Sequence, residues 1–311
     1  MNETITPYPF EAGEDILKVK TETTAHMQIL LGQPLFRPFD QEALLSSFET
    51  YYAFANMYFN EEEALRENEV KGANLFYHNR THAVEQATYD AISLTDAILA
   101  RNDRFSAHLT PEGTLAIVLA AMFHDTGYVS DGPVENYAAR TPIHVNESMA
   151  TFESMINLLG LPQGLDHAKV KKLGMIGIHG THFPFTSSHR NESQELMHNL
   201  TIEERKEAQI VRLTTQFADL GGQCARPDYF PQLVINLRRE MDEALPNLGT
   251  NIIGSDAELQ PNCEHFLNTF VRKASYPTKN VETTAIAFVG PEKSQVFRNA
   301  WKAQPIQSSF K

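Results

Sequence analysis

Two short stretches of the chain carry residues that could perform metal or acid–base chemistry. The first, "YHNRTHA" from Tyr77, places His78 and His82 four residues apart, with Asn79 beside the first histidine. Side chains at this spacing lie on one face of a helix. The two imidazoles could therefore share a metal ion, or one could bind metal while the other handles a proton. Two rings that are only hydrogen-bonded in a partly exposed groove would show the same spacing.

The second stretch, "LAAMFHDTGY", ends an apolar run with the adjacent residues His124 and Asp125. Neighbouring residues on a helix point about 100° apart, so both side chains reach a common point only near a helix end. Burying a histidine and an ionised aspartate is costly unless they have partners. A divalent cation would be such a partner; a hydrogen bond between the two side chains is the alternative.

A third acidic position, Asp219 in "TTQFADLGGQ", lies near the end of another predicted helix. An aspartate before glycines also commonly terminates a helix, so Asp219 alone indicates little. The order H…HD…D is more informative, because three helix ends would bring two imidazoles and two carboxylates to one centre. Such a mixed nitrogen and oxygen ligand set suits Mn, Fe, Zn or Mg.

The elements that must position these residues are predicted to be helical. Apolar residues at mixed three- and four-residue spacing predict a helix from Gln41, and Thr110 with Pro111 resembles an N-cap and first turn. Further helices are expected at about 77–99, 111–124, 142–159, 166–178, 201–220 and 229–245. "SSHRNES" from Ser187 is expected to be a mobile loop at the rim of a pocket, and strand-like alternation is confined to the neighbourhood of Val281.

Together these patterns predict one all-α bundle. We expect an N-terminal helical extension (1–60), a catalytic domain (61–245) and a C-terminal segment packed on it (246–311). The long helices before Tyr77 could complete the core or pack in a homodimer.

The formal net charge of −13 argues against a nucleic-acid duplex or an anionic membrane surface as the main partner. A small anionic substrate remains compatible with this charge, because bound divalent metals would reverse the local sign. The two cysteines, Cys224 and Cys263, form no CxxC pair, so we expect neither a disulfide framework nor a thiolate metal site. The acidic N-terminal stretch and the short apolar runs lead us to expect a cytoplasmic protein.

The order H…HD…D in a helical chain resembles the HD-domain metal-dependent phosphohydrolases. "YHNRTHA" is similar to the YHNxxHA signature of the class I cyclic nucleotide phosphodiesterases, and "FADLGG" with "YFPQLVINLRREMDE" resembles their stretch around the final metal-binding aspartate. The similarity extends over roughly residues 74–245. It implies an HD-domain helical bundle that hydrolyses a 3′,5′-cyclic nucleotide to the 5′-monophosphate with two divalent metal ions.

The resemblance also implies a role for each matching residue. The first metal ion would be held by His82, His124, Asp125 and Asp219. Asp125 would bridge to the second ion, and Asp219 could also orient the attacking hydroxide. His78 would protonate the leaving oxygen, while Tyr77 and Asn79 would support the pocket.

The chain departs from the phosphodiesterase pattern after the HD pair, where HDxDHPG is replaced by "HDTGYVS". His144 and His179 resemble instead the extra histidines that hold the second metal in microbial HD proteins, with His182 as an alternative to His179. Two imidazoles would favour Mn, Fe or Zn over Mg at that second position.

"KSQVF" resembles the SQxxF element of the phosphodiesterases, so Gln295 would read a purine edge and Phe297 would stack on it. Phe297 follows Gln295 by two positions rather than three, and an amphipathic C-terminal helix is the alternative interpretation. Two rival functions remain: an HD phosphohydrolase acting on a nucleoside monophosphate or a linear phosphoester, and a di-iron HD oxygenase with the pattern H…HD…H…H…D. The histidine of YHNxxH favours hydrolysis, because it could protonate an alkoxide leaving group.

Overall fold

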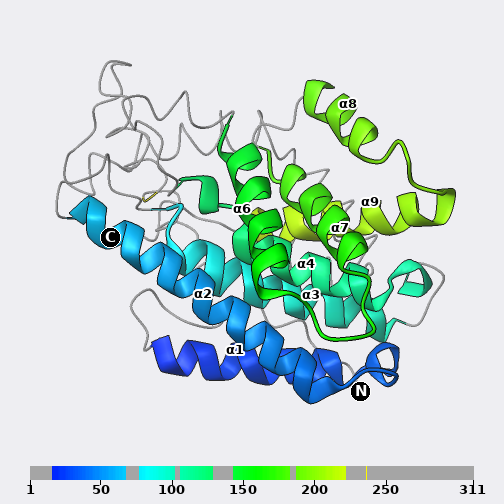
Figure 1. Ribbon diagram of the computed structural model, residues 1–311, viewed down its shortest axis with the longest axis horizontal. Helices are drawn as coiled ribbons and strands as arrows, with labels where there is room; N and C mark the ends of the chain where they lie inside the picture. The colour runs from blue at the N-terminus through cyan, green and yellow to red at the C-terminus, as the bar shows by residue number, and fades with distance from the viewer. Residues whose placement is uncertain are drawn as a thin grey trace, which may run out of the picture.

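The fold is known from a computed structural model that describes residues 16–67, 77–101, 106–128, 143–182 and 187–221, with Asn236. All regular structure in these ranges is helical, which confirms the expected all-α class (Figure 1). The α-helices are α1 (Ile16–Leu31), α2 (Gln41–Glu67), α3 (Thr88–Ala100), α4 (Pro111–Phe123), α6 (His144–Leu159), α7 (His167–His179), α8 (Ser187–Leu196) and α9 (Ile202–Gln216). The shorter elements are the 3-10 turns η1 (Pro34–Phe36), η3 (Ser106–His108) and η4 (Thr126–Tyr128), and the π-helices η2 (Thr81–Ala87) and η5 (Phe217–Gly221).

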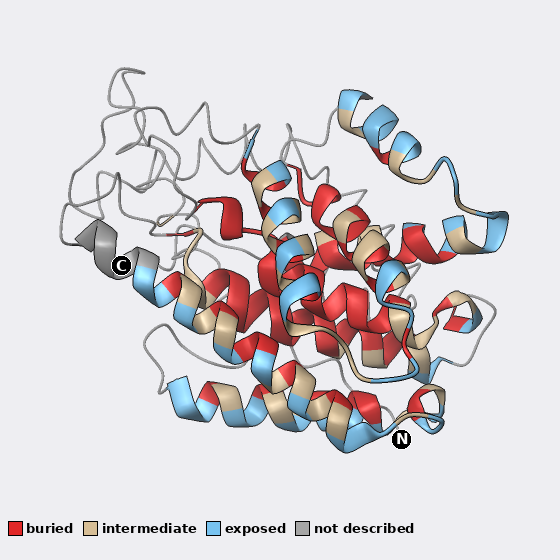
Figure 2. Ribbon diagram, viewed as in Figure 1, coloured by how far each residue is buried: buried red, intermediate tan, exposed pale blue. Residues whose placement is uncertain are grey.

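Helix α4 lies at the centre of the bundle, where α3, α6, α7 and α9 pack around it (Figure 1). Every residue from Gly113 to Phe123 is buried, as Figure 2 shows. A helix that is apolar all round has to be surrounded by protein, which explains its place. It begins as predicted: Thr110 caps the first turn by accepting a hydrogen bond from the Gly113 amide, and Pro111 takes the first position. The end of this buried helix therefore delivers His124 to the interior.

The two N-terminal helices belong to the same hydrophobic core as the rest of the described chain. α1 and α2 lie side by side along one edge of the bundle (Figure 1). Met27 and Phe59 are fully buried, and the ring of Tyr51 meets the edge of Phe123 at 6.3 Å. The domain boundaries at residues 60 and 245 stay a prediction, although α2 runs continuously past residue 60.

A buried carboxylate ties together α4, α7 and α9 at the end of α4 opposite His124. Glu207 accepts hydrogen bonds from Thr110, at 2.8 Å from its amide and 2.5 Å from its hydroxyl. Its other oxygen lies 2.9 Å from the ammonium of Lys169. Gly113 leaves the room for this carboxylate, because a Cβ there would come within 2.3 Å of a Glu207 oxygen.

One expectation about local structure is wrong. The stretch from Ser187, expected to be a loop, forms α8. Ser188 donates to Glu192 at 2.9 Å within the helix, and Ser193 is buried against α7, so a tertiary contact accompanies the helix. The helix expected at 229–245 and the strand-like stretch near Val281 lie outside the described ranges. None of the helices described is both long enough and apolar enough to cross a membrane.

Candidate metal centre

Three helix ends place His82, His124 and Asp219 together in the interior of the bundle. His82 lies in η2, His124 caps the C-terminus of α4, and Asp219 lies in η5, where α9 ends. All three side chains are buried, and they form a group that could hold a metal ion. Two of the three segments are π-helices, a winding that is rare and is frequent at functional sites. The structure thus assembles the predicted ligands at helix ends.

The spacing of the facing donor atoms fits a single ion. Nε2 of His82 lies 3.3 Å from Oδ2 of Asp125 and 3.2 Å from Oδ1 of Asp219. Nε2 of His124 lies 3.2 Å and 3.5 Å from the same two oxygens. Donor atoms that each lie about 2.0–2.2 Å from one transition-metal ion are roughly 3.0–3.5 Å from one another.

The orientation of His124 supports the same conclusion. Its Nδ1 lies 2.7 Å from the carbonyl oxygen of Ala121, so Nδ1 must carry the hydrogen that is donated. In the neutral ring, Nε2 then presents its lone pair to the centre. Nε2 of His124 and Oδ2 of Asp125 are buried, and neither has a hydrogen-bond partner among the described residues. The two atoms lie 3.2 Å apart without a hydrogen bond between them, which is an arrangement that a shared cation would satisfy.

Electrostatics couples the histidines to the carboxylates. Burial by itself would raise the pKa of Asp125, but the neighbouring histidines His124, His78 and His82 together outweigh it and hold that pKa well below its usual value. Burial by itself would lower the pKa of His124, yet the charges of Asp125 and Asp219 raise it well above its usual value. A metal ion binding here would therefore have to displace a proton, which makes its affinity dependent on pH.

The spacing predicts that His78 and His82 lie on one helix, but in the structure His78 precedes the helix that carries His82. The side chain of Asn79 accepts a hydrogen bond from the His82 amide at 3.0 Å, so the helix begins after Asn79 and His78 is left in the preceding bend. A side-chain bond of this kind is a helix N-cap, which fixes the residue at which the helix begins. The ring of His78 still lies 6.3 Å from that of His82, and Tyr77 packs on both rings, at 4.7 Å and 4.5 Å. His78 is thus close to the centre without belonging to the ligand group.

The histidines expected to serve a second metal occupy two places. His144, the first residue of α6, stacks on Tyr128 with ring centroids 4.1 Å apart. His179 and His182 lie at the end of α7 and form a second possible metal-binding group with Glu192 of α8. That His144 and His179 share one ion therefore stays a prediction, as does the choice between His179 and His182.

Residues of α8 around this second group were missed by the sequence reasoning. Nε2 of His179 lies 3.3 Å from a Glu192 oxygen, and its Nδ1 lies 2.9 Å from the hydroxyl of Ser193. His189 stacks on His182 at 3.9 Å, with the rings nearly parallel at 9°. Positions 189, 192 and 193 lie on one face of a helix. Their spacing would have indicated a shared site if the stretch had been predicted to be helical.

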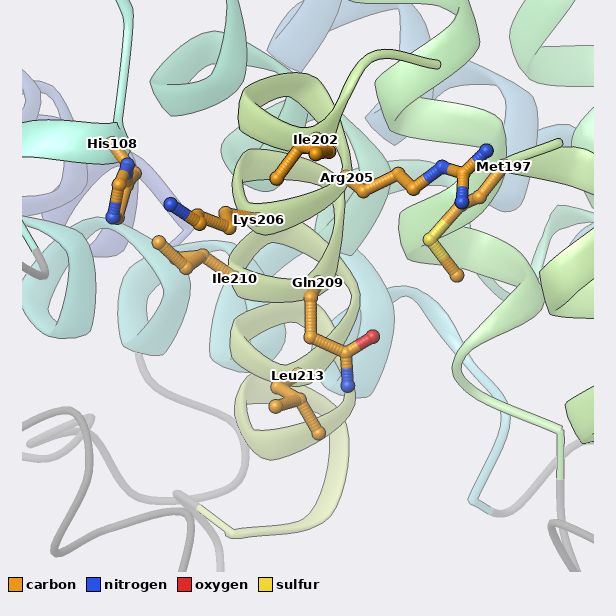
Figure 3. Close-up of a pocket in the computed structure, with 8 residues that line it drawn as sticks. All are labelled: His108, Met197, Ile202, Arg205, Lys206, Gln209, Ile210 and Leu213. Carbon is orange, nitrogen blue, oxygen red and sulfur yellow. The ribbon is translucent and has the colours of Figure 1, made fainter. Parts of the chain in front are cut away.

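The base-reading residues Gln295 and Phe297 lie outside the described ranges. A separate surface pocket lies against α9 (Figure 3). It is lined by His108, Met197, Ile202, Arg205, Lys206, Gln209, Ile210 and Leu213. Its lining includes none of the predicted site residues.

The sequence matches no protein-family model and no curated protein. Among solved structures, the chain is similar to the phosphodiesterase domain of the RhoPDE fusion protein from the choanoflagellate Salpingoeca rosetta, with a TM-score of 0.61. The match covers 98% of this chain and 95% of that chain, at 12% sequence identity. At this identity the likeness establishes the shared all-α fold.

Proposed function

We propose that the protein is a metal-dependent phosphodiester hydrolase that cleaves a 3′,5′-cyclic nucleotide to the 5′-monophosphate. One observation carries the proposal: the donor atoms of two buried histidines and two buried aspartates face one another at 3.2–3.5 Å. The likeness of the fold to a phosphodiesterase domain supports it. So does the YHNxxHA resemblance, because His82 of this motif belongs to the group and the ring of His78 lies 6.3 Å from that of His82.

The first metal ion would be held by His82, His124, Asp125 and Asp219. A second ion would share Asp125 and take imidazole from His144 or from His179 and His182, a nitrogen-rich set that favours Mn, Fe or Zn over Mg. Such ions lower the pKa of bound water and neutralise charge on the phosphate oxygens.

The protein's own groups supply orientation and the proton. The water oxygen, after one of its protons leaves to solvent, attacks phosphorus opposite the ribose 3′ oxygen. A new P–O bond forms, and the bond to the 3′ oxygen breaks. Asp219, an acceptor beside the centre, would orient the attacking oxygen through its hydrogen. His78, adjacent to the ligand group, would give a proton to the departing 3′ oxygen. In this proposal the two histidines of YHNxxHA have different roles: His82 binds metal and His78 donates a proton.

The substrate in this proposal is a small nucleotide rather than a nucleic acid. Gln295 and Phe297 would contact its base, as their resemblance to the SQxxF element implies.

The di-iron oxygenase is the rival that a specific observation favours, because His144, His179 and His182, the histidines that its pattern requires, are all buried. His78 counts against it, since oxygenation requires no protonated leaving group. The two functions differ in their measurable products.

The test is hydrolysis of a panel of substrates by the purified protein: 3′,5′-cyclic AMP, 3′,5′-cyclic GMP, linear dinucleotides and nucleoside monophosphates. Each is assayed with Mn²⁺, Mg²⁺, Zn²⁺ and Fe²⁺, with Asp125→Ala as the blank. Glu61→Ala, at an exposed position on α2, is the matched control. Turnover of a cyclic mononucleotide that only Asp125→Ala abolishes supports the proposal. Oxygen consumption by the iron-loaded protein without hydrolysis of any phosphoester would establish the rival.

The division of labour has its own test. His78→Ala should keep its bound metal and lose most turnover, whereas His82→Ala should lose metal as well. Less metal bound to His78→Ala than to His82→Ala would show that the roles are wrongly assigned.

A further inference from the structure

Three aromatic rings from distant parts of the chain form a stack beside the metal centre. The ring of Tyr128 lies 3.8 Å from that of His78, at an interplanar angle of 20°. On its other side lies the ring of His144, at 4.1 Å and 28°, while His78 and His144 are 6.5 Å apart. Tyr128 is thus the middle ring, and it is 4% exposed. The proposed reaction assigns no role to Tyr128.

The turn that carries Tyr128 is held rigidly between α4 and α6. The Tyr128 amide donates to the carbonyl of Asp125 at 2.9 Å, so the backbone of Tyr128 is tied to a residue of the metal centre. The Gly127 amide donates to the hydroxyl of Ser148 at 2.8 Å. A Cβ on Gly127 would come within 1.9 Å of the His144 carbonyl oxygen, so only glycine allows this approach. The place of Tyr128 is therefore determined from both sides.

His78 needs such support because it lies in a bend and not on a helix. Proton transfer requires the donor nitrogen to lie within hydrogen-bond reach of the accepting oxygen, about 2.6–3.2 Å. Rotation of the imidazole about its side-chain bonds would remove the nitrogen from that position. Near-parallel aromatic rings at this distance attract each other in an offset stack, which restricts the plane of both. The ring of Tyr77 meets His78 edge-on at 4.7 Å and 79°, which limits movement in a second direction.

We propose that Tyr128 is a positioning residue that holds the ring of His78 in the plane from which it protonates the leaving oxygen. The inference rests on the proposed hydrolase function. In the step concerned, the P–O bond to the ribose oxygen breaks and its electron pair stays on that oxygen. The proton of the His78 imidazolium moves to the same oxygen, and the neutral ring regains a proton from solvent. Tyr128 neither gives nor takes a proton, so its ring matters and its hydroxyl does not.

The test compares leaving groups that differ in their need for a proton. The cyclic nucleotide releases an alkoxide, which needs one, whereas bis(4-nitrophenyl) phosphate releases a phenolate that departs as an anion. Tyr128→Leu removes the ring, and Tyr128→Phe retains it. General acids contribute about 10²–10⁴-fold. Partial loss of that contribution predicts that Tyr128→Leu lowers kcat on the cyclic nucleotide by about 10–100-fold, with KM within about threefold. Activity of Tyr128→Leu on the aryl ester should stay within about threefold, as should that of Tyr128→Phe on both substrates.

A double-mutant cycle shows whether Tyr128 acts through His78. In a His78→Ala background, Tyr128→Leu should cause no further loss of kcat, because the two changes remove the same contribution. If Tyr128→Leu does not fold, Tyr128→Met removes the ring with another flexible apolar side chain and is read in the same way.

Each other outcome overturns the inference. Equal losses on both substrates would mean that Tyr128 only maintains the structure, and additive losses in the cycle would mean that it acts independently of His78. A loss in Tyr128→Phe equal to that in Tyr128→Leu would assign the role to the hydroxyl. Wild-type protein that hydrolyses neither substrate with any metal would refute the proposed function itself, which separates that failure from failure of the inference.

Discussion

Replacing Glu207 with alanine tests the packing of α4, α7 and α9, which its carboxylate joins. Glu207 is 2% exposed, and its carboxylate contacts both Thr110 and Lys169. Without it, the Thr110 amide loses its acceptor, and Lys169 keeps a hydrogen bond to the Thr110 hydroxyl at 2.9 Å and a single carboxylate, Glu112, at 3.9 Å. The network lies at the end of α4 opposite His124. We therefore expect a loss of stability while the metal centre of the folded molecules stays intact.

The size of the stability loss follows from the burial of the ion pair between Glu207 and Lys169. Removing one partner of a buried ion pair costs about 3–5 kcal/mol. The side chain of Lys169 is 25% exposed, so solvent screens part of its charge. We therefore expect Glu207→Ala to lower the free energy of unfolding by about 2–4 kcal/mol. At about 2–4 °C per kcal/mol, Tm should fall by at least about 4 °C.

Urea denaturation followed by circular dichroism measures this loss. The matched control is Glu203→Ala, one turn earlier on α9, where an exposed carboxylate pairs with Lys206 at 2.7 Å. Exposed pairs contribute little, so this variant should unfold close to the wild type. A Glu207→Ala midpoint that coincides with that of Glu203→Ala would refute the reasoning.

The remaining predictions concern packing, pH and metal. Gly113→Ala places a Cβ 2.3 Å from a Glu207 oxygen and should cost about 1–3 kcal/mol in the same urea experiment; wild-type stability would show that the carboxylate moves without penalty. Burial lowers the pKa of His182 from 6.5 to about 3. The unfolded chain therefore binds the proton more readily, and stability is lost as pH falls from about 6.5 towards 3. The Tm of metal-free His182→Gln should fall less over that range than that of the wild type, and equal falls would contradict this. Mn²⁺ or Zn²⁺ added to chelator-treated protein should raise its stability by about 2.7 kcal/mol at a hundredfold excess over Kd. His124→Ala should lose most of this gain and His198→Ala, an exposed control, should keep it; an undiminished gain in His124→Ala would place the ion elsewhere.

The start of α4 was predictable because its signal is local. Thr110 and Pro111 start α4 by capping chemistry that acts over one turn. His82, His124, Asp125 and Asp219 could be grouped because each was expected at a helix end, where residues distant in sequence can meet. The structure brings their donor atoms within 3.2–3.5 Å of one another, which residue spacing alone did not guarantee.

The features that the sequence did not reveal depend on tertiary contacts or on hydrogen bonds between a side chain and the nearby backbone. The helix α8 packs Ser193 and Glu192 against His179, and a polar stretch such as "SSHRNES" gives little sign of that partner. His78 was expected on the face of a helix, but the side chain of Asn79 bonds the His82 amide and starts the helix later. The π-helical winding at His82 and Asp219 has no pattern in apolar spacing that distinguishes it from an α-helix.

The central claim is that the centre formed by His82, His124, Asp125 and Asp219 binds the metal on which phosphodiester hydrolysis depends. The most direct measurement is a titration of metal-free protein with Mn²⁺ that follows bound metal and the rate of cyclic nucleotide hydrolysis together. We predict that the rate rises in proportion to the metal bound, and that Asp219→Asn shows neither binding of comparable affinity nor turnover. Hydrolysis that is independent of bound metal, or that persists in Asp219→Asn at the wild-type rate, would contradict the claim.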